Sequence, residues 1–405
     1  MKTATILRAT ASGLLLSLML SACSDSPEKM LSSAKDFIGK NDSKAAVIQL
    51  KNALQANPNM AEARFLLGKA LLQGGDAVGA ESELRKAREL KHPDDDTLPW
   101  LARAMLQQGQ FRKLTDELAK TELTQPQARA DLLTTVATAW AAQGKADLFA
   151  AALDAALLAQ PGYGPALIAQ ARAKAGRGDF DAALAMLEEV TLKNPDSEEA
   201  FKLKGDILRM AKNQPDQALA AYRQAIKAKP SYVAGQLGVI NVLLAQGKLD
   251  DATTEMAVLK KIAGGQPQTR FMEAHLAYQK KDYKAAREQI LQVLKSVQGN
   301  AAVLQLAGAI EFQLNSMVQA ESYLAKAVQS APGLALARRL LVLTYLRTGQ
   351  VPKALATLPP DLAKNDRDVD MLSVAGQAYL QSGDVAKAQE FFGRAAKLDP
   401  KDGCV

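Results

Sequence analysis

The chain has 405 residues, of which 48% are hydrophobic and 5% aromatic, and its 50 Lys and Arg residues against 43 Asp and Glu residues give a net charge of +7. The charges are spread along the chain, whereas a nucleic-acid-binding protein clusters its basic residues and adds stacking aromatic ones, so we expect no nucleic-acid partner. Strong helix formers such as Ala, Leu, Lys and Gln are abundant. Alternating runs of Val, Ile and Thr, which favour strands, are nearly absent. The composition therefore predicts an all-α protein.

Residues 1–22 have the features of a cleaved signal peptide. Lys2 and Arg8 give a positively charged start, and an apolar stretch runs from Ala9 to Ala22. A membrane-spanning helix needs roughly 20 residues, and this shorter stretch fits a signal peptide better. The run Leu20-Ser21-Ala22-Cys23 resembles a bacterial lipobox. The alternative is an ordinary signal peptide with a chance cysteine.

The lipobox resemblance implies that Cys23 is acylated and becomes the mature N-terminus, with residues 23–26 as a lipidated tether. Ser24 follows the cysteine, which by similarity to known lipoproteins implies the outer membrane, facing the periplasm. Acyl chains on one residue anchor a protein strongly, at about 0.8 kcal/mol for each buried methylene. Cys404 is then the one remaining thiol, so we expect a fold without an intramolecular disulfide.

Prolines recur along the chain at a nearly constant spacing. Pro161, Pro195 and Pro230 lie at almost equal intervals, and Pro332 and Pro400 follow at whole multiples of that interval. The interval is about 34 residues, which is the period of tetratricopeptide repeats, each a pair of antiparallel helices. The register divides residues 27–402 into eleven units, which begin at Pro27, Ala61, Asp95, Ala130, Gly164, Glu198, Val233, Pro267, Ala301, Ala335 and Val369.

Small residues recur at fixed positions of this register. Position 8 is Ala or Gly in nine of the eleven units, and position 20 is Ala in eight. Gly inside a helix costs about 1 kcal/mol relative to Ala, so its recurrence indicates that paired helices approach closely there. The turn at position 15 is marked by Gly75, Gly109, Gly144, Gly178, Gly247, Gly349 and Gly383. These patterns predict a tetratricopeptide α-solenoid: a right-handed superhelix of about eleven helical hairpins, whose first helices line a concave face.

The pattern weakens at identifiable places. Leu114 and Phe149 stand at position 20 of the third and fourth units, so we expect those two hairpins to be splayed. Pro352 and then Pro359-Pro360 cut short the second helix of the tenth unit, and we expect a bend near residues 359–368. Residues 403–405 form a short tail without a capping helix, so we expect the array to be a shortened form of a longer protein.

Three segments go beyond generic repeat character, namely residues 45–55, 61–68 and 80–87. Together with the lipobox they resemble the PEP-CTERM system tetratricopeptide lipoprotein family, which accompanies exosortase-type protein sorting and exopolysaccharide production in Gram-negative bacteria. The resemblance implies a scaffold that binds proteins of an export or sorting machine. The alternative is direct binding or guidance of an exported, anionic polysaccharide in the groove.

Candidate binding residues follow from the positions that face the groove in related arrays, namely 2, 5, 9 and 12 of the first helix. They are Phe65, Lys69, Arg172, Lys202, Arg209, Asn241, Phe271, His275, Tyr278 and Phe312. Arg172, Lys202 and Arg209 form a candidate basic strip for an acidic peptide or an anionic polymer, with plain solvated charges as the alternative. For Phe271 and Tyr278 the alternative is packing against the adjacent repeat.

The sequence lacks the motifs of common enzymes and metal sites. It has no Walker loop, no paired Cys spacing and no Gly-Xaa-Ser-Xaa-Gly elbow. His92 and His275 lie far apart in the sequence, and we expect His92 to be solvated at a turn between repeats. Residues 94–96 are three aspartates, which fit a helix N-terminus better than a calcium loop. We therefore expect a binding protein that uses no metal or cofactor and catalyses no reaction.

Overall fold

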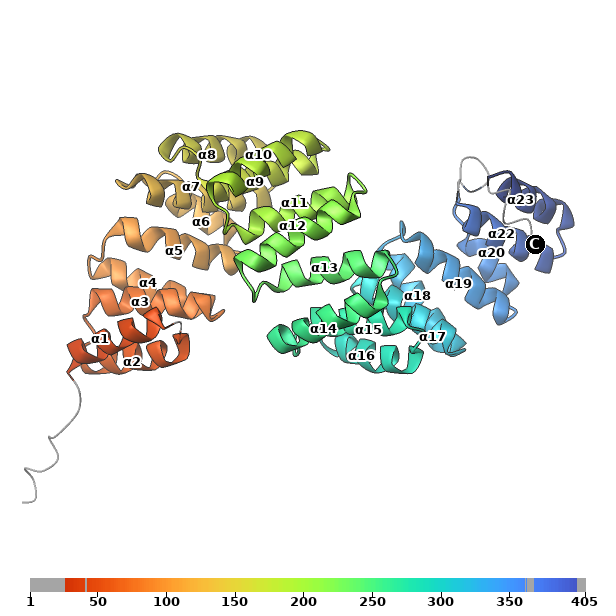
Figure 1. Cartoon of the computed structure of the whole chain (residues 1–405), viewed down its shortest axis with the longest axis horizontal. Helices are drawn as coiled ribbons and strands as arrows, with labels where there is room; N and C mark the ends of the chain where they lie inside the picture. The colour runs from red at the N-terminus through yellow and green to blue at the C-terminus, as the bar shows by residue number, and fades with distance from the viewer. Residues whose placement is uncertain (1–25, 41, 361, 363–367, 399–405) are drawn as a thin grey trace, which may run out of the picture. The chain divides into compact units, whose positions relative to one another are not determined.

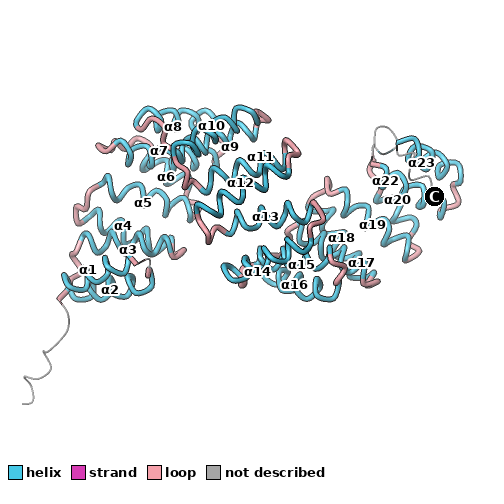
Figure 2. The backbone as a smooth tube through the Cα atoms, viewed as in Figure 1, coloured by secondary structure: helices cyan, strands magenta, loops and turns pink. Residues whose placement is uncertain are grey.

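The structure is a computed structural model that describes residues 26–40, 42–360, 362 and 368–398. Every regular element in these ranges is an α-helix, and short turns join the helices (Figure 2). The chain divides into two compact units, residues 1–195 and 196–405. The predicted signal peptide, Cys23 and the tail at 403–405 lie outside the described residues. Within the described ranges, no helix combines the length and apolar character that crossing a bilayer requires.

In each unit the helices follow one another as antiparallel pairs (Figure 1). The helices of the first unit are α1 (Pro27–Gly39), α2 (Ser43–Ala56), α3 (Ala61–Gln73), α4 (Ala77–Glu89), α5 (Asp94–Gln107), α6 (Phe111–Leu118), α7 (Pro126–Ala142), α8 (Ala146–Ala159), α9 (Gly164–Gly176) and α10 (Phe180–Lys193). The prediction of an all-α array of helical hairpins is confirmed.

The second unit continues the same arrangement with six further hairpins in its described part. Its helices are α11 (Glu198–Met210), α12 (Pro215–Ala228), α13 (Val233–Ala245), α14 (Leu249–Ala263), α15 (Pro267–Gln279), α16 (Tyr283–Ser296), α17 (Ala301–Gln313), α18 (Met317–Ser330), α19 (Ala335–Arg347), α20 (Val351–Thr357), α22 (Val369–Gln381) and α23 (Val385–Leu398).

The predicted register agrees closely with the helix boundaries. Nine of the eleven predicted starting residues are the first residues of the first helices. The exceptions are α5, which begins at Asp94, and α7, which begins at Pro126 and thus one helical turn before the predicted Ala130. Proline at the first position of α7 is favourable, because the missing N–H would lack a partner there and the ring presets the helical φ.

The turn inside each hairpin uses the left-handed backbone conformation. All seven glycines predicted at position 15 have positive φ, between 70° and 90°. Where glycine is absent, Asn213, Lys281 and Asn315 take its place with φ of 50°, 62° and 60°. Asn visits this region with little strain, but Lys carries a Cβ that is penalised there. The turn geometry is therefore a property of the repeat, and glycine is its least strained solution.

The side chain that takes the space beside each position-8 glycine differs from the prediction. A Cβ at Gly68 would lie 2.6 Å from the Cγ atom of Leu84, and one at Gly308 would lie 2.5 Å from that of Leu324. Both leucines are at position 24. The predicted approach to the small residue at position 20 is also present, since the backbone oxygen of Ala80 would lie 3.2 Å from the Cβ at Gly68, but the nearest atoms belong to the leucine. The glycines therefore make room for a large side chain of the second helix, which fills the space between the two helices.

The first helices of successive repeats form a continuous row in each unit. They contact one another from α3 to α9 in the first unit and from α11 to α22 in the second. Second helices of neighbouring repeats make at most marginal contact within the described residues, and each packs instead on the next first helix. Because the first helices are more closely spaced, their row forms the inner side of each unit, as predicted.

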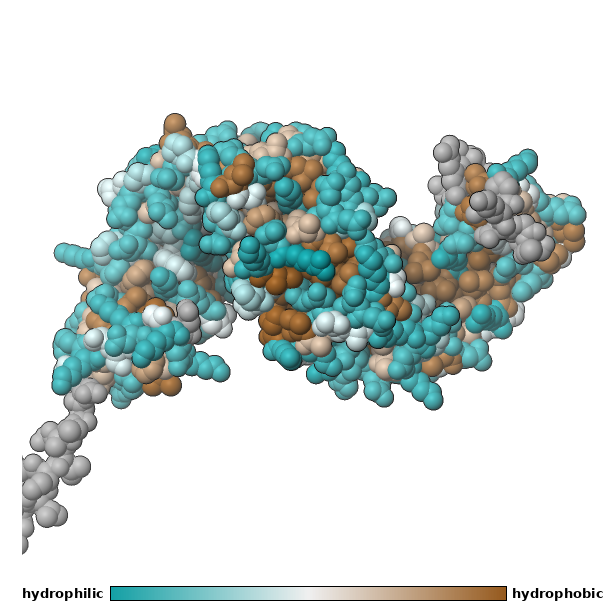
Figure 3. Space-filling view, in the orientation of Figure 1, coloured by the Kyte–Doolittle hydropathy of each residue, from teal (hydrophilic) through white to brown (hydrophobic). Residues whose placement is uncertain are grey.

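The buried core of each unit consists of separate clusters, which neighbouring repeats share. One buried cluster joins α1, α2 and α3, and another runs from α3 to α7. A third is shared by α7, α8 and α9, and comparable clusters join neighbouring repeats of the second unit. The visible surface is largely hydrophilic, with apolar patches between the polar side chains (Figure 3). Because the core is divided into such clusters, the free energy of unfolding of each unit is a sum of contributions from single hairpins and from the contacts between neighbouring repeats.

Hydrogen bonds from the hairpin turn tie several of the repeats to the preceding one. Glu81 on α4, only 9% exposed, accepts hydrogen bonds from Gln108 at 2.8 Å and from Gln110 at 3.0 Å. Lys113 at 3.0 Å and Arg85 at 2.9 Å complete its partners. Burial raises the pKa of Glu81, but the hydrogen bonds from Lys113, Arg85 and Gln108 outweigh it and lower the pKa to about 2.

The same connection occurs in the second unit. Glu321, at the position equivalent to Glu81, accepts hydrogen bonds from Gln350 at 3.1 Å and Lys353 at 3.3 Å. These donors belong to the turn and second helix of the following repeat, as Gln110 and Lys113 do. A carboxylate at position 21 occurs in these two of the eleven units, and in both of them the following repeat satisfies its charge.

Of the two hairpins that we expected to be splayed, the third fits the expectation and the fourth does not. The third hairpin fits the expectation, because α6 is short and its contact with α5 is less extensive than that of any other hairpin in the described chain. For the fourth hairpin the expectation is wrong, because α7 and α8 pack as extensively as any pair. Phe149 is half-buried, packs on the core cluster shared by α7, α8 and α9, and also lines a pocket with residues of these helices.

The prolines of the tenth repeat shorten its second helix as predicted. This helix, α20, has only 7 residues and ends before Pro359. Proline removes a backbone donor and clashes with the preceding turn, so the helix cannot continue through Pro359 and Pro360. Most of the predicted bend at 359–368 lies outside the described residues.

Candidate functional site

The inner row of the first unit carries a stack of cations on an aromatic ring. The Nζ atom of Lys69, a predicted groove residue, lies 4.9 Å from the centroid of the Trp100 ring. The guanidinium carbon of Arg103 lies 4.8 Å from the same centroid, and Arg103 also donates to the carboxylate of Asp131 at 2.7 and 2.5 Å. These side chains come from α3, α5 and α7, so the stack links three consecutive repeats. The charge of Arg103 is paired with Asp131, and that of Lys69 faces the ring.

Phe65, the other predicted groove residue of the second repeat, packs between repeats. Its ring stacks on that of His92 with centroids 4.4 Å apart. The Nδ1 atom of His92 lies 3.0 Å from the hydroxyl of Thr97. The expectation that His92 is solvated is therefore wrong, because the turn folds its ring against the preceding repeat and leaves it half-buried.

In the second unit, Lys202 and Arg209 surround an unexpected acidic residue. Lys202 forms an ion pair of 2.6 Å with Asp206, one helical turn away on α11. The hydroxyl of Tyr222 donates a hydrogen bond of 2.8 Å to the same carboxylate. Burial raises the pKa of Tyr222, and the bond to Asp206 adds to this, whereas a hydrogen bond involving Arg209 lowers it. The carboxylate compensates Lys202, whereas Arg209 forms no ion pair within the described residues and its Nε atom has no hydrogen-bond partner there.

Three predicted groove residues lie together on one face of α15. Phe271, His275 and Tyr278 follow one another at helical spacing, and the Phe271 and His275 ring centroids are 6.5 Å apart. The ring of Tyr278 also contacts that of Tyr283, with centroids 5.5 Å apart. All four residues are half-buried, and Phe271 and Tyr278 pack on the buried cluster between α15 and α17. Burial lowers the pKa of His275 and raises that of Tyr278.

Phe312 and Asn241, two further predicted groove residues, differ in exposure. Phe312 is 5% exposed, and the guanidinium carbon of Arg347 lies 4.0 Å from its ring centroid. Its ring is therefore part of the core rather than a surface for a ligand. Asn241 is half-buried on α13.

Arg172 lines an apolar pocket of the first unit that the sequence did not predict. The pocket, which we call the Phe149 pocket, has a volume of about 360 Å³. It is lined by Thr138, Ala141, Gly144, Ala146, Phe149, Ala169, Arg172, Ala173 and Arg177. These residues come from α7, α8, α9 and the two turns that follow α7 and α9. The one signal in the sequence was Phe149 at a position normally occupied by Ala.

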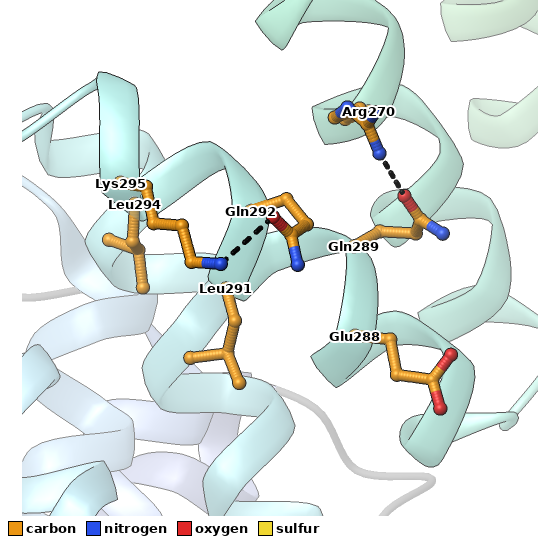
Figure 4. Close-up of a pocket in the computed structure, with 7 residues that line it drawn as sticks. All are labelled: Arg270, Glu288, Gln289, Leu291, Gln292, Leu294 and Lys295. Atoms are coloured by element: carbon orange, nitrogen blue, oxygen red, sulfur yellow. Dashed lines mark hydrogen bonds between the residues drawn. The ribbon is translucent and has the colours of Figure 1, made fainter.

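A larger and more polar hollow lies in the second unit, on α15 and α16 (Figure 4). Its volume is about 910 Å³. Arg270 donates to Gln289 at 3.4 Å and Lys295 to Gln292 at 3.1 Å, so these polar groups are partnered (Figure 4). The labelled side chains are spread along α16 rather than directed to one point. This hollow has the character of an open helix surface, and we do not place the site there.

No group of three or more potential metal ligands occurs in the described ranges. The buried and half-buried titratable residues, such as Tyr222 and His275, lie in separate packing environments.

Comparison with known proteins defines the family. A tetratricopeptide-repeat model matches residues 157–405, and a second one matches residues 31–95. The chain belongs to the tetratricopeptide-repeat family. Members of this family bind protein partners, so family membership places the chain among protein-interaction scaffolds. No curated protein sequence matches it.

Several solved structures are similar to the chain at low sequence identity. The human IFIT1 dimer with PPP-AAAA is 18% identical, with 90% of this chain and 89% of that chain covered and a TM-score of 0.53. Yeast Tom70 is 13% identical over 94% of this chain and 90% of that one, with a TM-score of 0.45. PilW, a type IV pilus biogenesis factor, is 19% identical over 52% of this chain and 98% of that one, with a TM-score of 0.45. At these identities the likeness concerns the fold alone.

Proposed function

We propose that this tetratricopeptide-repeat protein is an outer-membrane-anchored, periplasmic scaffold for proteins of an exopolysaccharide export and exosortase-type sorting machine. Two features of the sequence support this assignment. The run from Leu20 to Cys23 resembles a lipobox, and residues 45–55, 61–68 and 80–87 resemble the lipoproteins of that system. The cellular role rests on these resemblances, and the scaffold role rests on the family.

The pairing of charges on the inner rows supports a protein partner over an anionic polymer. Lys202 is compensated by Asp206, and Arg103 by Asp131. Polymer binding through charge requires a field of uncompensated cations along the path. A protein surface, in contrast, is recognised by separate apolar and polar contacts that match in shape. Lys202 and Arg103 therefore do not contribute to such a field, and their pairing is the observation that favours a protein partner.

Cell fractionation tests the anchor. Wild-type protein should be recovered with outer membranes, and Cys23→Ser should move to the soluble periplasmic fraction. A matched change of the neighbouring serine, Ser24→Ala, keeps the acylation site and should leave the protein in the membrane. Membrane retention of Cys23→Ser would contradict the lipid anchor.

Co-purification tests the partner. The tagged protein, extracted in mild detergent after brief crosslinking, should retain proteins encoded with the export or sorting system. Treatment of the extract with a polysaccharide-degrading enzyme should leave that retention unchanged. If the isolated array instead retains polymer and no protein, the polysaccharide alternative is correct.

A further inference from the structure

We propose that the Phe149 pocket binds a segment of a partner protein that presents an apolar side chain next to a carboxylate. The assignment rests on the proposed scaffold function and names the chemistry that one of its surfaces recognises. It depends on three observations: the apolar lining, two arginines without partners in the described chain, and a helix N-terminus at the edge.

The lining defines the apolar part of the ligand. Ala141, Ala146, Ala169 and Ala173 contribute only methyl groups, and Phe149 contributes the one large apolar surface. Ligand pockets in proteins range from about 300 to 1,000 Å³, and a volume of about 360 Å³ lies near the lower end. The space therefore fits one or two side chains of a peptide, and burial of an apolar side chain there favours binding.

The charge of the pocket is uncompensated. Arg172 and Arg177 both line it and are exposed, and no ion pair or side-chain hydrogen bond to either guanidinium group occurs within the described residues. No acidic side chain lines the pocket. Elsewhere in the same unit, Arg64 is paired with Glu83 at 2.6 Å and Arg103 with Asp131. The pocket thus differs from its surroundings by offering free donors.

Guanidinium groups select the anion. Their planar arrangement of N–H donors matches a carboxylate, which accepts two parallel hydrogen bonds. Two such groups beside an apolar lining require a ligand that has both properties within a few ångströms. A side-chain or terminal carboxylate next to Leu, Ile or Met in a peptide satisfies this requirement, whereas a polysaccharide offers no apolar side chain for the alanine-lined part.

The start of α8 adds to the positive potential. Ala146, the first residue of this helix, lines the pocket, and no side chain caps the helix N-terminus. The unpaired N–H groups of a first turn carry a partial positive charge that favours an anion nearby. Asp147 in the same turn does not line the pocket. The N-terminus of α8 and the two arginines therefore both favour an anion at the pocket.

The test uses the purified full chain in detergent and a defined probe. The probe is a fluorescein-labelled peptide, Gly-Ser-Asp-Leu-Asp-Ser-Gly, and a second version carries photo-leucine in place of leucine. We expect saturable binding in fluorescence anisotropy. Replacement of the leucine by serine, or of both aspartates by asparagine, should weaken binding at least tenfold, which corresponds to about 1.4 kcal/mol.

The protein variants are matched in charge. Arg172→Gln with Arg177→Gln should weaken binding of the probe about tenfold. Arg223→Gln with Lys227→Gln removes two exposed positive charges from α12 and should change it less than twofold. Photo-leucine should attach to residues 138–149 or 169–177, as mapped by mass spectrometry. Circular dichroism identifies any variant that has lost its helices.

Each outcome bears on the pocket separately from the scaffold role. Equal weakening by both double variants, or photo-attachment elsewhere, would overturn the assignment of this pocket. Absence of any binding by the wild-type chain would do the same. If Arg172→Gln with Arg177→Gln loses the probe while all co-purified proteins remain, the pocket stands as a binding site but is not the main scaffold surface. If the wild-type protein co-purifies with no protein of the export or sorting system, that result contradicts the proposed function rather than the pocket.

Discussion

The hydroxyl of Tyr222, on the second helix of its hairpin, donates a hydrogen bond of 2.8 Å to Asp206 on the first helix. The ring reaches this position because it lies against two glycines. A Cβ at Gly205 would be 2.6 Å from the ring, and one at Gly238, in the following repeat, would be 2.5 Å from it. One side chain therefore joins two repeats and places a polar group at the inner row.

Substitution of either glycine by alanine should destabilise the second unit. Alanine normally stabilises a helix by about 1 kcal/mol relative to glycine, but overpacking a filled core costs about 1–3 kcal/mol. We expect Gly205→Ala and Gly238→Ala to increase hydrogen exchange in α11, α12 and α13. Gly393→Ala is the control, because a Cβ there meets no atom within 4 Å, and it should stabilise α23. Unchanged exchange in both core variants would show that the ring moves aside without cost.

Removal of the Tyr222 hydroxyl isolates the contribution of its hydrogen bond. Tyr222→Phe keeps the ring between the glycines but leaves Asp206 with one partner fewer, and we expect a loss of about 1 kcal/mol. Tyr323→Phe is the control, since no hydrogen bond of its hydroxyl occurs in the described part of the chain. Urea unfolding followed by circular dichroism measures both. Equal effects would mean that the hydroxyl of Tyr222 contributes nothing specific.

The Glu81 network predicts a pH dependence at acid pH. The folded pKa of about 2 lies below the ordinary value of 4.5, so the folded state binds the proton less readily than the unfolded state. The stabilisation is complete above the ordinary pKa and is lost as the pH falls toward the folded one. Glu81→Gln should destabilise the first unit by about 1–3 kcal/mol at neutral pH and flatten its acid unfolding profile. If the acid unfolding profile of Glu81→Gln is as steep as that of wild type, Glu81 is excluded as a source of the pH dependence.

His275 predicts a second dependence, closer to neutral pH. Its folded pKa is lowered by burial from 6.5, so the unfolded state takes up the proton first. Stability should therefore be complete above the ordinary pKa and decrease as the pH falls below it. Nuclear magnetic resonance of the imidazole should show a titration midpoint below the ordinary value. His275→Gln should reduce the loss of stability on mild acidification, and a midpoint above the ordinary value would reverse the predicted sign.

The turn at Lys281 offers a stabilising substitution. Its φ of 62° is one that glycine adopts at little cost, and seven other repeats have glycine there. Lys281→Gly should stabilise the protein by about 1 kcal/mol by relieving strain at the Cβ. Lys280, the preceding residue, has a φ of −75°, so Lys280→Gly should be neutral or destabilising. Thermal unfolding distinguishes the two, and equal shifts would argue against strain at Lys281.

The repeat register was predictable because it depends on local chemistry that recurs. Glycine at the turn and proline just beyond a helix each act within a few residues of their own position. The inner surface was less predictable, because Asp206, Trp100 and Asp131 gain their roles from side chains of other helices. Arg177 was missed for the same reason. It stands at position 14, outside the groove positions, and lines the pocket together with residues of α7, α8 and α9.

The division of the core into clusters shared by neighbouring repeats has a consequence for the history of the gene. An in-frame duplication or deletion of one repeat-length block leaves every surviving hairpin with a neighbour of the same kind, so it changes the number of binding positions without demanding a new core. Selection can therefore act on the gain and loss of whole repeats. In a protein with one undivided hydrophobic core, the same change would disrupt the packing.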